Sequence, residues 1–191
     1  MNVETVDYRA SDAGETLTRS LRDTGFAVLA NHPITPERID TIYAAWGDFF
    51  AGQDKFDYAV QPPAHDGYFA FRSENAKDSP VKDLKEFFHV YPGCRLPEEL
   101  TRITRAIYAD LETLGRELLH WIEQGAPTSV AEKLKMPLGD MMKGSDQSLL
   151  RILHYPPVED AEPGAIRAAA HEDINLITIL PSSNRSGLQV S

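Results

Sequence analysis

The chain has 191 residues, of which 42% are hydrophobic, 25% are charged and 9% are aromatic, and its formal net charge is −10. This length suits one domain with a sizeable core, and the acidic balance disfavours nucleic-acid phosphates and anionic membranes as partners. The single cysteine, Cys94, excludes an internal disulfide and a cysteine-based zinc cluster. Neither a membrane-spanning run nor a signal peptide is evident. We therefore expect a cytoplasmic protein with no nucleic-acid and no membrane partner.

The first 52 residues predict two strands and two helices. Asp12 with Glu15 three residues later reads as a capping box, and Gly25 stands where a C-cap glycine ends a helix. Pro36 suits the first position of a second helix, whose apolar residues share one face. The predicted elements are an edge strand within 1–10, a helix between Asp12 and Gly25, a buried strand at 26–29, and an amphipathic helix from Pro36 to Gly52.

The middle of the chain predicts a hairpin-like pair of strands followed by the longest helix. Strands are expected at 67–71 and 85–91, separated by a polar segment, 72–83, that we expect to act as a loop or lid. Leucine and isoleucine at intervals of three and four residues predict a helix over 97–124. A shorter helix is expected from Ser129 to about Pro137, with Glu132 completing a second capping box.

After residue 145 the pattern becomes extended. Strands are predicted at 148–155, 171–180 and 187–190, with an acidic loop at 158–167. Helices that precede strands favour an α+β protein, in which a helical layer packs on a mostly antiparallel β core. We accordingly divide the chain into an N-terminal helical and strand region, 1–145, and the first part of a β core, 146–191.

One tripeptide, His171-Glu172-Asp173, carries the pattern of a metal site. Side chains two apart on an extended segment point to the same side, so the imidazole of His171 and the carboxylate of Asp173 are aimed at one point. These are two of the three ligands of the 2-His-1-carboxylate triad that holds non-haem iron(II). With 6 His in the chain, however, such a tripeptide arises easily by chance, so its context must decide.

The order of short motifs along the chain resembles the isopenicillin-N-synthase-like branch of the iron(II)/2-oxoglutarate-dependent oxygenases. No one motif is specific, but all of them follow in the family's order. They are Gly25-Phe26 through Asn31-His32, Gly67-Tyr68, Lys85-Glu86-Phe87-Phe88, Leu150-Arg151 through Tyr155-Pro156-Pro157, His171-x-Asp173 with the apolar run to Leu180, and Gly187-Leu188-Gln189-Val190.

This resemblance implies a double-stranded β-helix core, a cupin-like jelly roll, with iron at one mouth. His171 and Asp173 would be the metal ligands, and Tyr155 would hydrogen-bond the carboxylate of the co-substrate 2-oxoglutarate or of the substrate. Arg151 would face the same pocket and pair with an acidic substrate, although a structural arginine explains it equally well. The resemblance also implies Fe(II), 2-oxoglutarate and O2 as cofactor and co-substrates, and a small molecule as substrate.

The sequence departs from the family pattern after Asp173. The family has a second histidine ligand and an R-x-S or R-x-T motif on later strands, and the 191 residues contain neither. We expect the β core to be incomplete within this sequence, most simply because it is part of a longer chain; an inactive remnant and completion by another chain are the alternatives. An unpaired apolar edge around Leu188 and Val190 would favour self-association.

Four functional hypotheses follow. The first is oxidation of a small molecule coupled to decarboxylation of 2-oxoglutarate, with release of succinate and CO2. The second is an iron oxidase that does not use 2-oxoglutarate, which release of succinate would distinguish from the first. The third is a catalytically inactive binding or scaffold protein, which would not hold stoichiometric iron. The fourth, a cupin-like hydrolase or isomerase, predicts a histidine-rich site and is disfavoured by the single histidine of this segment.

Overall fold

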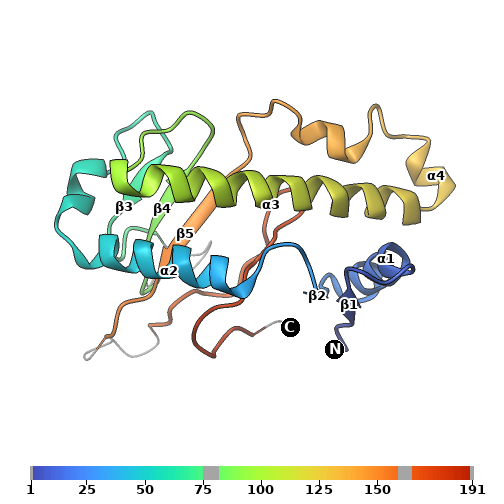
Figure 1. Cartoon of the computed structure of the whole chain (residues 1–191), viewed down its shortest axis with the longest axis horizontal. Helices are drawn as coiled ribbons and strands as arrows, with labels where there is room; N and C mark the ends of the chain where they lie inside the picture. Colours follow the sequence, from blue (N-terminus) through green and yellow to red (C-terminus); the bar gives the residue numbers. More distant parts are fainter. Residues whose placement is uncertain (1, 75–81, 159–164, 190–191) are drawn as a thin grey trace. The chain divides into compact units, whose positions relative to one another are not determined.

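The computed structural model describes residues 2–74, 82–158 and 165–189. Within these ranges the chain is α+β (Figure 1). The helices are α1 (Ala13–Thr24), α2 (Pro36–Ala51), α3 (Glu98–Gly125) and α4 (Thr128–Ala131), with 3-10 turns η1 (Asp54–Tyr58) and η2 (Leu138–Met142). The strands are β1 (Thr5–Asp7), β2 (Val28–Ala30), β3 (Gly67–Phe69), β4 (Glu86–Val90) and β5 (Leu150–His154).

The chain forms two compact units. The first unit comprises Met1–Ile39, Ala109–Ser145 and Ile177–Ser191, and the second comprises Asp40–Tyr108 and Asp146–Leu176. Helices α2 and α3 each contribute residues to both units. The sequence predicted a different kind of division, in which 146–191 begins the β core and 1–145 precedes it. That division stays a prediction. No helix of the described ranges is both long and apolar enough to cross a membrane.

The first unit contains a two-stranded sheet in which β1 and β2 run parallel, with Val6 opposite Leu29. Helix α1 connects these strands and ends as predicted: Gly25 has a left-handed φ of 77°, and its N–H donates to the carbonyl of Leu21 over 2.8 Å. The predicted capping box is wrong, because Asp12 makes no side-chain cap hydrogen bond. Its φ of −102° and ψ of 11° depart from the extended backbone that an N-cap residue normally adopts.

The strand expected at 26–29 forms two residues later, and it is not buried. β2 covers Val28–Ala30, while Phe26 and Val28 remain 43% and 53% exposed. The prediction of a buried strand is therefore wrong. The physical reason is that, within the part of the chain that the structure describes, β2 pairs only with β1, so it is not enclosed as the central strand of a larger sheet would be.

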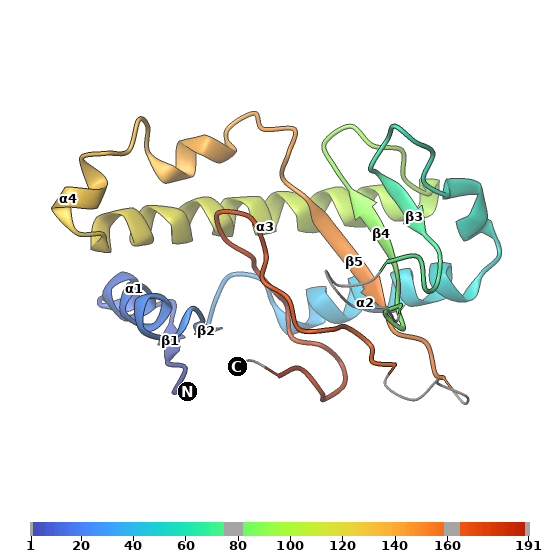
Figure 2. The same ribbon diagram turned by 180° about the vertical axis from the view of Figure 1, so that it is seen from behind.

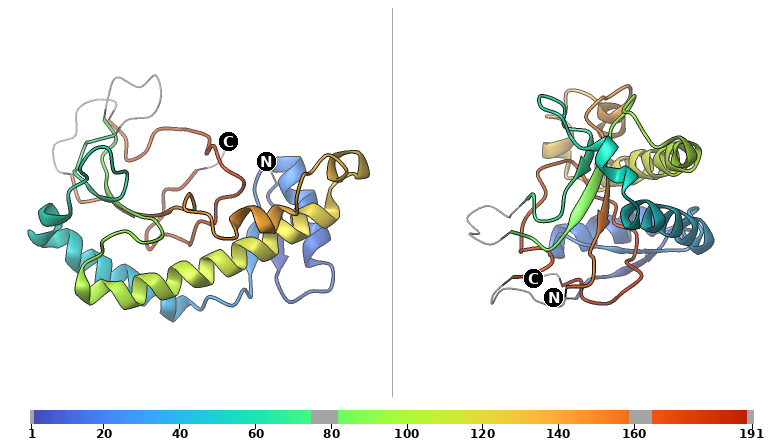
Figure 3. Two further views of the ribbon diagram at one scale, coloured as in Figure 1. Left: turned by 90° about the horizontal axis from the view of Figure 1, so that it is seen from above. Right: turned by 90° about the vertical axis from the view of Figure 1, so that its left-hand side faces the viewer.

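The second unit is built on the antiparallel sheet β3-β4-β5. Successive side chains of β4 alternate between its two faces. Phe88 points to the face covered by α2 and α3, and its ring lies 5.0 Å from that of Trp46. The indole N–H of Trp46 donates to Thr104 Oγ1 over 3.0 Å, which joins the two helices in a fully buried contact. Figure 3 shows both helices on one side of these strands.

The same face of the sheet buries the carboxylate of Glu86, which is only 4% exposed. It is satisfied by three donors: Lys55 Nζ at 3.0 Å, the hydroxyl of Tyr68, and His154 Nδ1 at 2.7 Å. Burial alone raises the pKa of Glu86, but the hydrogen bonds from Tyr68, His154 and Lys55 outweigh it, so that the pKa lies below its ordinary value. Glu86 of the Lys-Glu motif thus forms a structural ion pair with Lys55, whereas Lys85 pairs with Asp83 and Glu74.

The strand predicted at 171–180 is absent from the structure. The chain continues past β5 without entering a strand ladder over residues 165–189, as Figure 2 shows for the red segment. A strand exists only where a neighbour offers a row of backbone donors and acceptors, and the described residues place none beside this segment. The last predicted strand is also absent over 187–189, and Val190 lies outside the described residues. Most of the predicted lid, 75–81, and the middle of the acidic loop, 159–164, lie outside them too.

Helix α4 is shorter than the helix expected from Ser129 to Pro137. It covers Thr128–Ala131 and is preceded by Pro127, whose carbonyl accepts from the N–H groups of Val130 and Ala131. The predicted capping box at Ser129 is therefore wrong, because that residue lies inside the helix and not before it.

Candidate metal centre

His171 and Asp173 converge, although the segment that carries them is not a strand. His171 Nε2 lies 3.7 Å from Asp173 Oδ1, and the two side chains are 54% and 46% exposed. His171 Nδ1 lies 2.8 Å from the carbonyl of Ala169, which assigns the ring proton to Nδ1, because a carbonyl only accepts. In the neutral ring Nε2 then carries the lone pair, on the side of the Asp173 carboxylate.

This donor set fits an iron(II) ion. A ligating histidine normally donates its other ring N–H to a carbonyl or carboxylate, which fixes the tautomer and the ring orientation. The Ala169 carbonyl provides that contact here. Among the described residues no group of three or more His, Cys, Asp or Glu side chains gathers to hold a metal, so the dyad would supply two protein ligands.

Arg151 lies on β5, and its guanidinium contacts His89 and Phe87 of β4 and, before β4, Glu74. Its Nε donates to His89 Nε2 over 2.9 Å, its Nη1 lies 3.5 Å from a carboxylate oxygen of Glu74, and its guanidinium carbon lies 4.9 Å from the centre of the Phe87 ring. These residues lie on the face of the sheet opposite α2 and α3. An acidic ligand at Arg151 would therefore compete with Glu74.

His89 is the acceptor that orients Arg151. Its Nδ1 lies 3.0 Å from the carbonyl of His65, so Nδ1 carries the proton and Nε2 accepts from Arg151. Burial lowers the pKa of His89 to about 4, with the positive charge of Arg151 acting in the same direction and the His65 carbonyl opposing them. The ring is therefore neutral near pH 7.

Tyr155 follows β5 and shares the Arg151 side of the chain, since the two residues are four apart on an extended backbone. Tyr155 is 37% exposed. Burial raises the pKa of the Tyr155 phenol, while the positive charges of Lys85 and Arg151 act against this effect and the negative charge of Asp83 adds to it. The phenol stays protonated at neutral pH and can donate a hydrogen bond.

The structure therefore joins the predicted site residues in two pairs. It brings His171 to Asp173, and it places Arg151 and Tyr155 on one side of β5. The contacts that hold Arg151 run to Glu74 and His89 instead of reaching toward the dyad. The assignments of His171, Asp173, Tyr155 and Arg151 stay predictions.

Asp83 is not among the residues that the sequence predicted for the site. This residue is 3% exposed, and its carboxylate accepts a hydrogen bond from the N–H of Ala169, two residues before His171. The signal in the sequence was weak: an Asp two residues before the Lys-Glu motif that opens a buried strand. Only the fold shows that this Asp meets a segment 86 residues further on.

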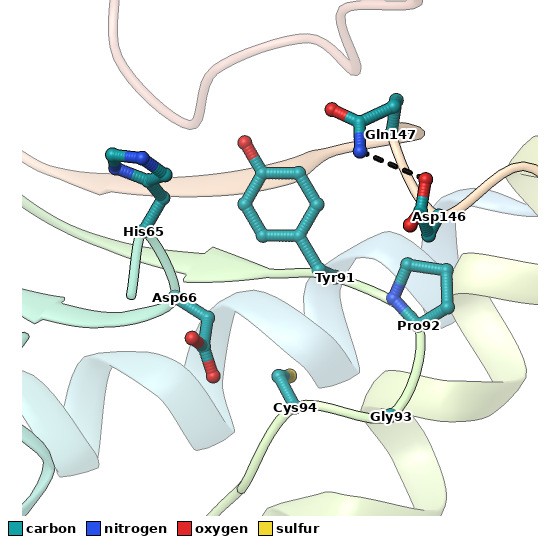
Figure 4. A pocket seen from close by; sticks show the side chains of 8 residues that line it. All are labelled: His65, Asp66, Tyr91, Pro92, Gly93, Cys94, Asp146 and Gln147. Carbon is teal, nitrogen blue, oxygen red and sulfur yellow. Dashed lines mark hydrogen bonds between the residues drawn. The ribbon is translucent and has the colours of Figure 1, made fainter. Parts of the chain in front are cut away.

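A separate hollow of about 340 Å³ lies in the second unit (Figure 4). It is lined by His65, Asp66, Tyr91, Pro92, Gly93, Cys94, Asp146 and Gln147. In the close-up, Tyr91 projects between His65 and Gln147, and Gln147 donates to Asp146 over 2.8 Å. None of the predicted site residues lines it, so the hollow is distinct from the candidate metal centre.

An α+β chain that carries a His-x-Asp dyad beside an antiparallel sheet fits the class of non-haem iron oxygenases. The family model described as "non-haem dioxygenase in morphine synthesis N-terminal" matches residues 4–106, which is more than half of the chain. The chain belongs to this dioxygenase family. The match confirms the resemblance inferred from the order of the motifs.

Curated relatives and solved structures agree with this family. The chain is 24% identical over 229 residues to a 2-oxoglutarate-dependent dioxygenase of a Dothideomycetidae species and 27% identical over 225 residues to a proline hydroxylase of Petromyces alliaceus. Both matches cover 100% of this chain, with 66% and 67% of the relatives. The chain thus spans about two thirds of the length of these curated relatives.

Two crystal structures share the fold. A candidate oxygenase from Shewanella oneidensis is 47% identical, with a TM-score of 0.81, over 92% of this chain and 63% of its own. A 2OG-Fe(II) oxygenase family protein from Caulobacter crescentus is 29% identical, with a TM-score of 0.62, over 84% of this chain and 58% of its own.

Proposed function

We propose that this chain is part of an iron(II)- and 2-oxoglutarate-dependent dioxygenase that oxidises a small molecule by hydroxylation, desaturation or ring formation. The observation that carries the proposal is the convergence of His171 Nε2 and Asp173 Oδ1 at 3.7 Å in a member of the dioxygenase family. The relatives named as 2-oxoglutarate-dependent dioxygenase and proline hydroxylase support it. In this proposal residues 146–191, which include β5, are the first part of a double-stranded β-helix core.

His171 and Asp173 would hold the metal, with the Ala169 carbonyl fixing the imidazole for coordination. Iron(II) bound with 2-oxoglutarate and O2 would supply the oxidising chemistry, with release of succinate and CO2. The phenolic O–H of Tyr155 would donate a hydrogen bond to a co-substrate carboxylate. Arg151 would bind an acidic group of the substrate, which would displace the Glu74 carboxylate. A carboxylate oxygen of Glu74 lies 3.5 Å from Arg151 Nη1, and the Glu74 side chain is itself partly exposed.

The first test measures metal binding at the dyad. His171→Ala and Asp173→Ala each remove one ligand, and Glu172→Ala, which changes the residue between them, is the matched control. We expect the protein to bind Fe(II), or Co(II) as a spectroscopic substitute, and each dyad variant to bind at least about tenfold more weakly, since even outer contacts of a ligand are typically worth 10–100-fold. Equal affinity in all four proteins would remove the dyad from the proposal.

The second test separates the alternatives. The native gene product is incubated with Fe(II), O2 and 2-oxoglutarate, and succinate is measured with and without a panel of small-molecule substrates. Release of succinate supports the dioxygenase over the oxidase that does not use 2-oxoglutarate. Stoichiometric iron binding opposes the inactive scaffold. Iron bound without any turnover of 2-oxoglutarate would overturn the proposed activity.

The remaining expectations on partners extend this proposal. The net charge of −10 supports the expectation that neither nucleic acid nor an anionic membrane is a partner. A cytoplasmic location remains part of the proposal and rests on the composition of the sequence. Self-association through an unpaired apolar edge around Leu188 and Val190 is part of the same proposal.

A further inference from the structure

Asp83 is a buried carboxylate whose two oxygens have different tasks. Oδ2 lies 2.9 Å from Lys85 Nζ, and Oδ1 accepts the backbone N–H of Ala169 at 3.2 Å. The side chain is only 4% exposed. A buried carboxylate is costly unless it is paired and hydrogen-bonded, and both conditions are met at this position.

Lys85 fixes the orientation of that carboxylate. Its ammonium is 6% exposed and also lies 2.9 Å from Glu74 Oε2. Burial alone lowers the pKa of Lys85, but the hydrogen bonds to Asp83 and Glu74 outweigh it, so that the pKa lies above its ordinary value. The ammonium is thus charged, and it anchors Oδ2 of Asp83 while the N–H of Ala169 binds Oδ1.

A second backbone contact ties the same two segments together. The N–H of Leu84 donates to the carbonyl of Ile166 over 3.0 Å, so residues 83 and 84 hold residues 166 and 169. The carbonyl of Ala169 in turn accepts from His171 Nδ1. A continuous path of hydrogen bonds therefore leads from Lys85 through Asp83 and Ala169 to the imidazole of the dyad.

We propose that Asp83, anchored by Lys85, is a positioning residue that holds the segment before the dyad and so fixes the orientation and tautomer of His171. This inference rests on the proposed function for its meaning, because it explains how a metal ligand can be aimed from a segment that is not a strand. Asp83 and Leu84, which precede β4, perform the task that a strand ladder would otherwise perform. A merely structural ion pair would stabilise the sheet without setting the state of the His171 ring.

The test compares Asp83→Ala and Asp83→Asn with Glu86→Gln in the metal-free protein. Glu86→Gln is the matched control, because Glu86 belongs to a buried ion pair of the same sheet whose contacts run to Lys55, Tyr68 and His154 and not to residues 166–171. Three readouts are taken at matched stability: hydrogen exchange at the Ala169 amide, the ring ¹⁵N shifts of His171, which report its tautomer, and Co(II) affinity.

We expect Asp83→Ala to accelerate exchange at Ala169 by at least about tenfold, to shift the His171 ring toward a mixture of tautomers, and to weaken Co(II) binding by about 10–100-fold. Asp83→Asn keeps an acceptor oxygen but loses the charge that Lys85 holds, so its effects should be smaller in the same direction. Glu86→Gln should leave the Ala169 and His171 readouts unchanged.

Unchanged exchange at Ala169 and unchanged His171 shifts in a folded Asp83→Ala protein would overturn the inference. Where Asp83→Ala does not fold, Asp83→Asn decides: faster exchange at Ala169 supports the inference and unchanged exchange overturns it. A failure of the proposed function looks different. In that case His171→Ala binds Co(II) as tightly as the unaltered protein, and the first two readouts still decide whether Asp83 positions the ring.

Discussion

Three histidines show how hydrogen-bond partners set the role of one side-chain type. His154 lies against the buried Glu86 carboxylate and stacks on Phe50 at 5.1 Å between ring centres. His89 is enclosed and accepts from Arg151. Of the three, only His171 has an exposed side chain whose Nε2 lies near a second potential metal ligand, Asp173. The sequence separates them only through the tripeptide spacing, because burial is decided by residues far away along the chain.

The buried His89 ring makes the stability of the fold depend on pH. Its pKa is lowered from 6.5 to about 4, so folding favours the neutral ring. This stabilisation is fully present above the unfolded pKa, near 6.5, and is lost progressively as the pH falls from 6.5 to about 4. We expect this ring to account for roughly 2 kcal/mol of lost unfolding free energy between pH 7 and pH 5, at about 1.4 kcal/mol per pKa unit.

The measurement is urea unfolding at both pH values, together with an NMR titration of the ring. His89→Gln is the informative variant, because glutamine offers one donor and one acceptor but does not titrate. The loss between pH 7 and pH 5 should be smaller by about the same 2 kcal/mol in that variant. Titration of the His89 ring near 6.5 in the folded protein would contradict the expectation.

At the scale of elements, local signals predicted the helices well. Helix α2 begins at Pro36 and α3 spans Glu98–Gly125, as the proline position and the intervals of three and four residues predicted. These signals act between residues close in sequence, where a helix makes its hydrogen bonds. The strand expected at 171–180 failed for the opposite reason, since its apolar alternation says nothing about whether a partner strand lies alongside.

Two glycines should respond in opposite directions to the same substitution. Gly25 ends α1 with φ at 77° and has open space where a methyl group would project, whereas Gly47 lies inside α2, also with open space. Gly25→Ala should destabilise the fold by about 1 kcal/mol, because a Cβ is disfavoured in the left-handed region. Gly47→Ala should stabilise it by about 0.5–1 kcal/mol, because alanine loses less backbone freedom in a helix.

Thermal or urea unfolding of both variants measures this difference, and Gly25→Asn serves as the control. Asparagine tolerates the left-handed region better than alanine, so that variant should retain more stability than Gly25→Ala. Equal effects of Gly25→Ala and Gly47→Ala would show that the C-cap conformation does not limit α1.

At the scale of the whole molecule, the sequence predicted the family and the dyad but not the contacts that support it. The motif order worked because each motif is short and local. Asp83 remained hidden because its partner, Ala169, has a backbone N–H that no sequence pattern marks. Arg151 was predicted to face a substrate, yet its ties to Glu74 and His89 depend on the register of β4 and β5.

The described residues after the dyad carry exposed apolar side chains, and we propose that these favour self-association of the chain. Ile174 is fully exposed, and Leu176, Leu180 and Leu188 are 54%, 60% and 72% exposed. Removing such side chains from water is favourable at about 25 cal/mol per Å², while the net charge of −10 opposes contact between copies. Added salt screens that repulsion. We therefore expect association of copies that grows with protein concentration and with ionic strength.

Sedimentation velocity over a range of concentrations and salt measures this association. The variant Leu176→Ser/Leu180→Ser/Leu188→Ser should shift the equilibrium toward monomer. The control Val130→Ser/Met136→Ser, which alters two side chains that are each 49% exposed elsewhere in the chain, should not. If the control reduces association as much as the triple variant, general surface hydrophobicity is the cause. If the unaltered protein stays monomeric at high salt, the expectation is wrong, because screened repulsion would no longer hold the copies apart.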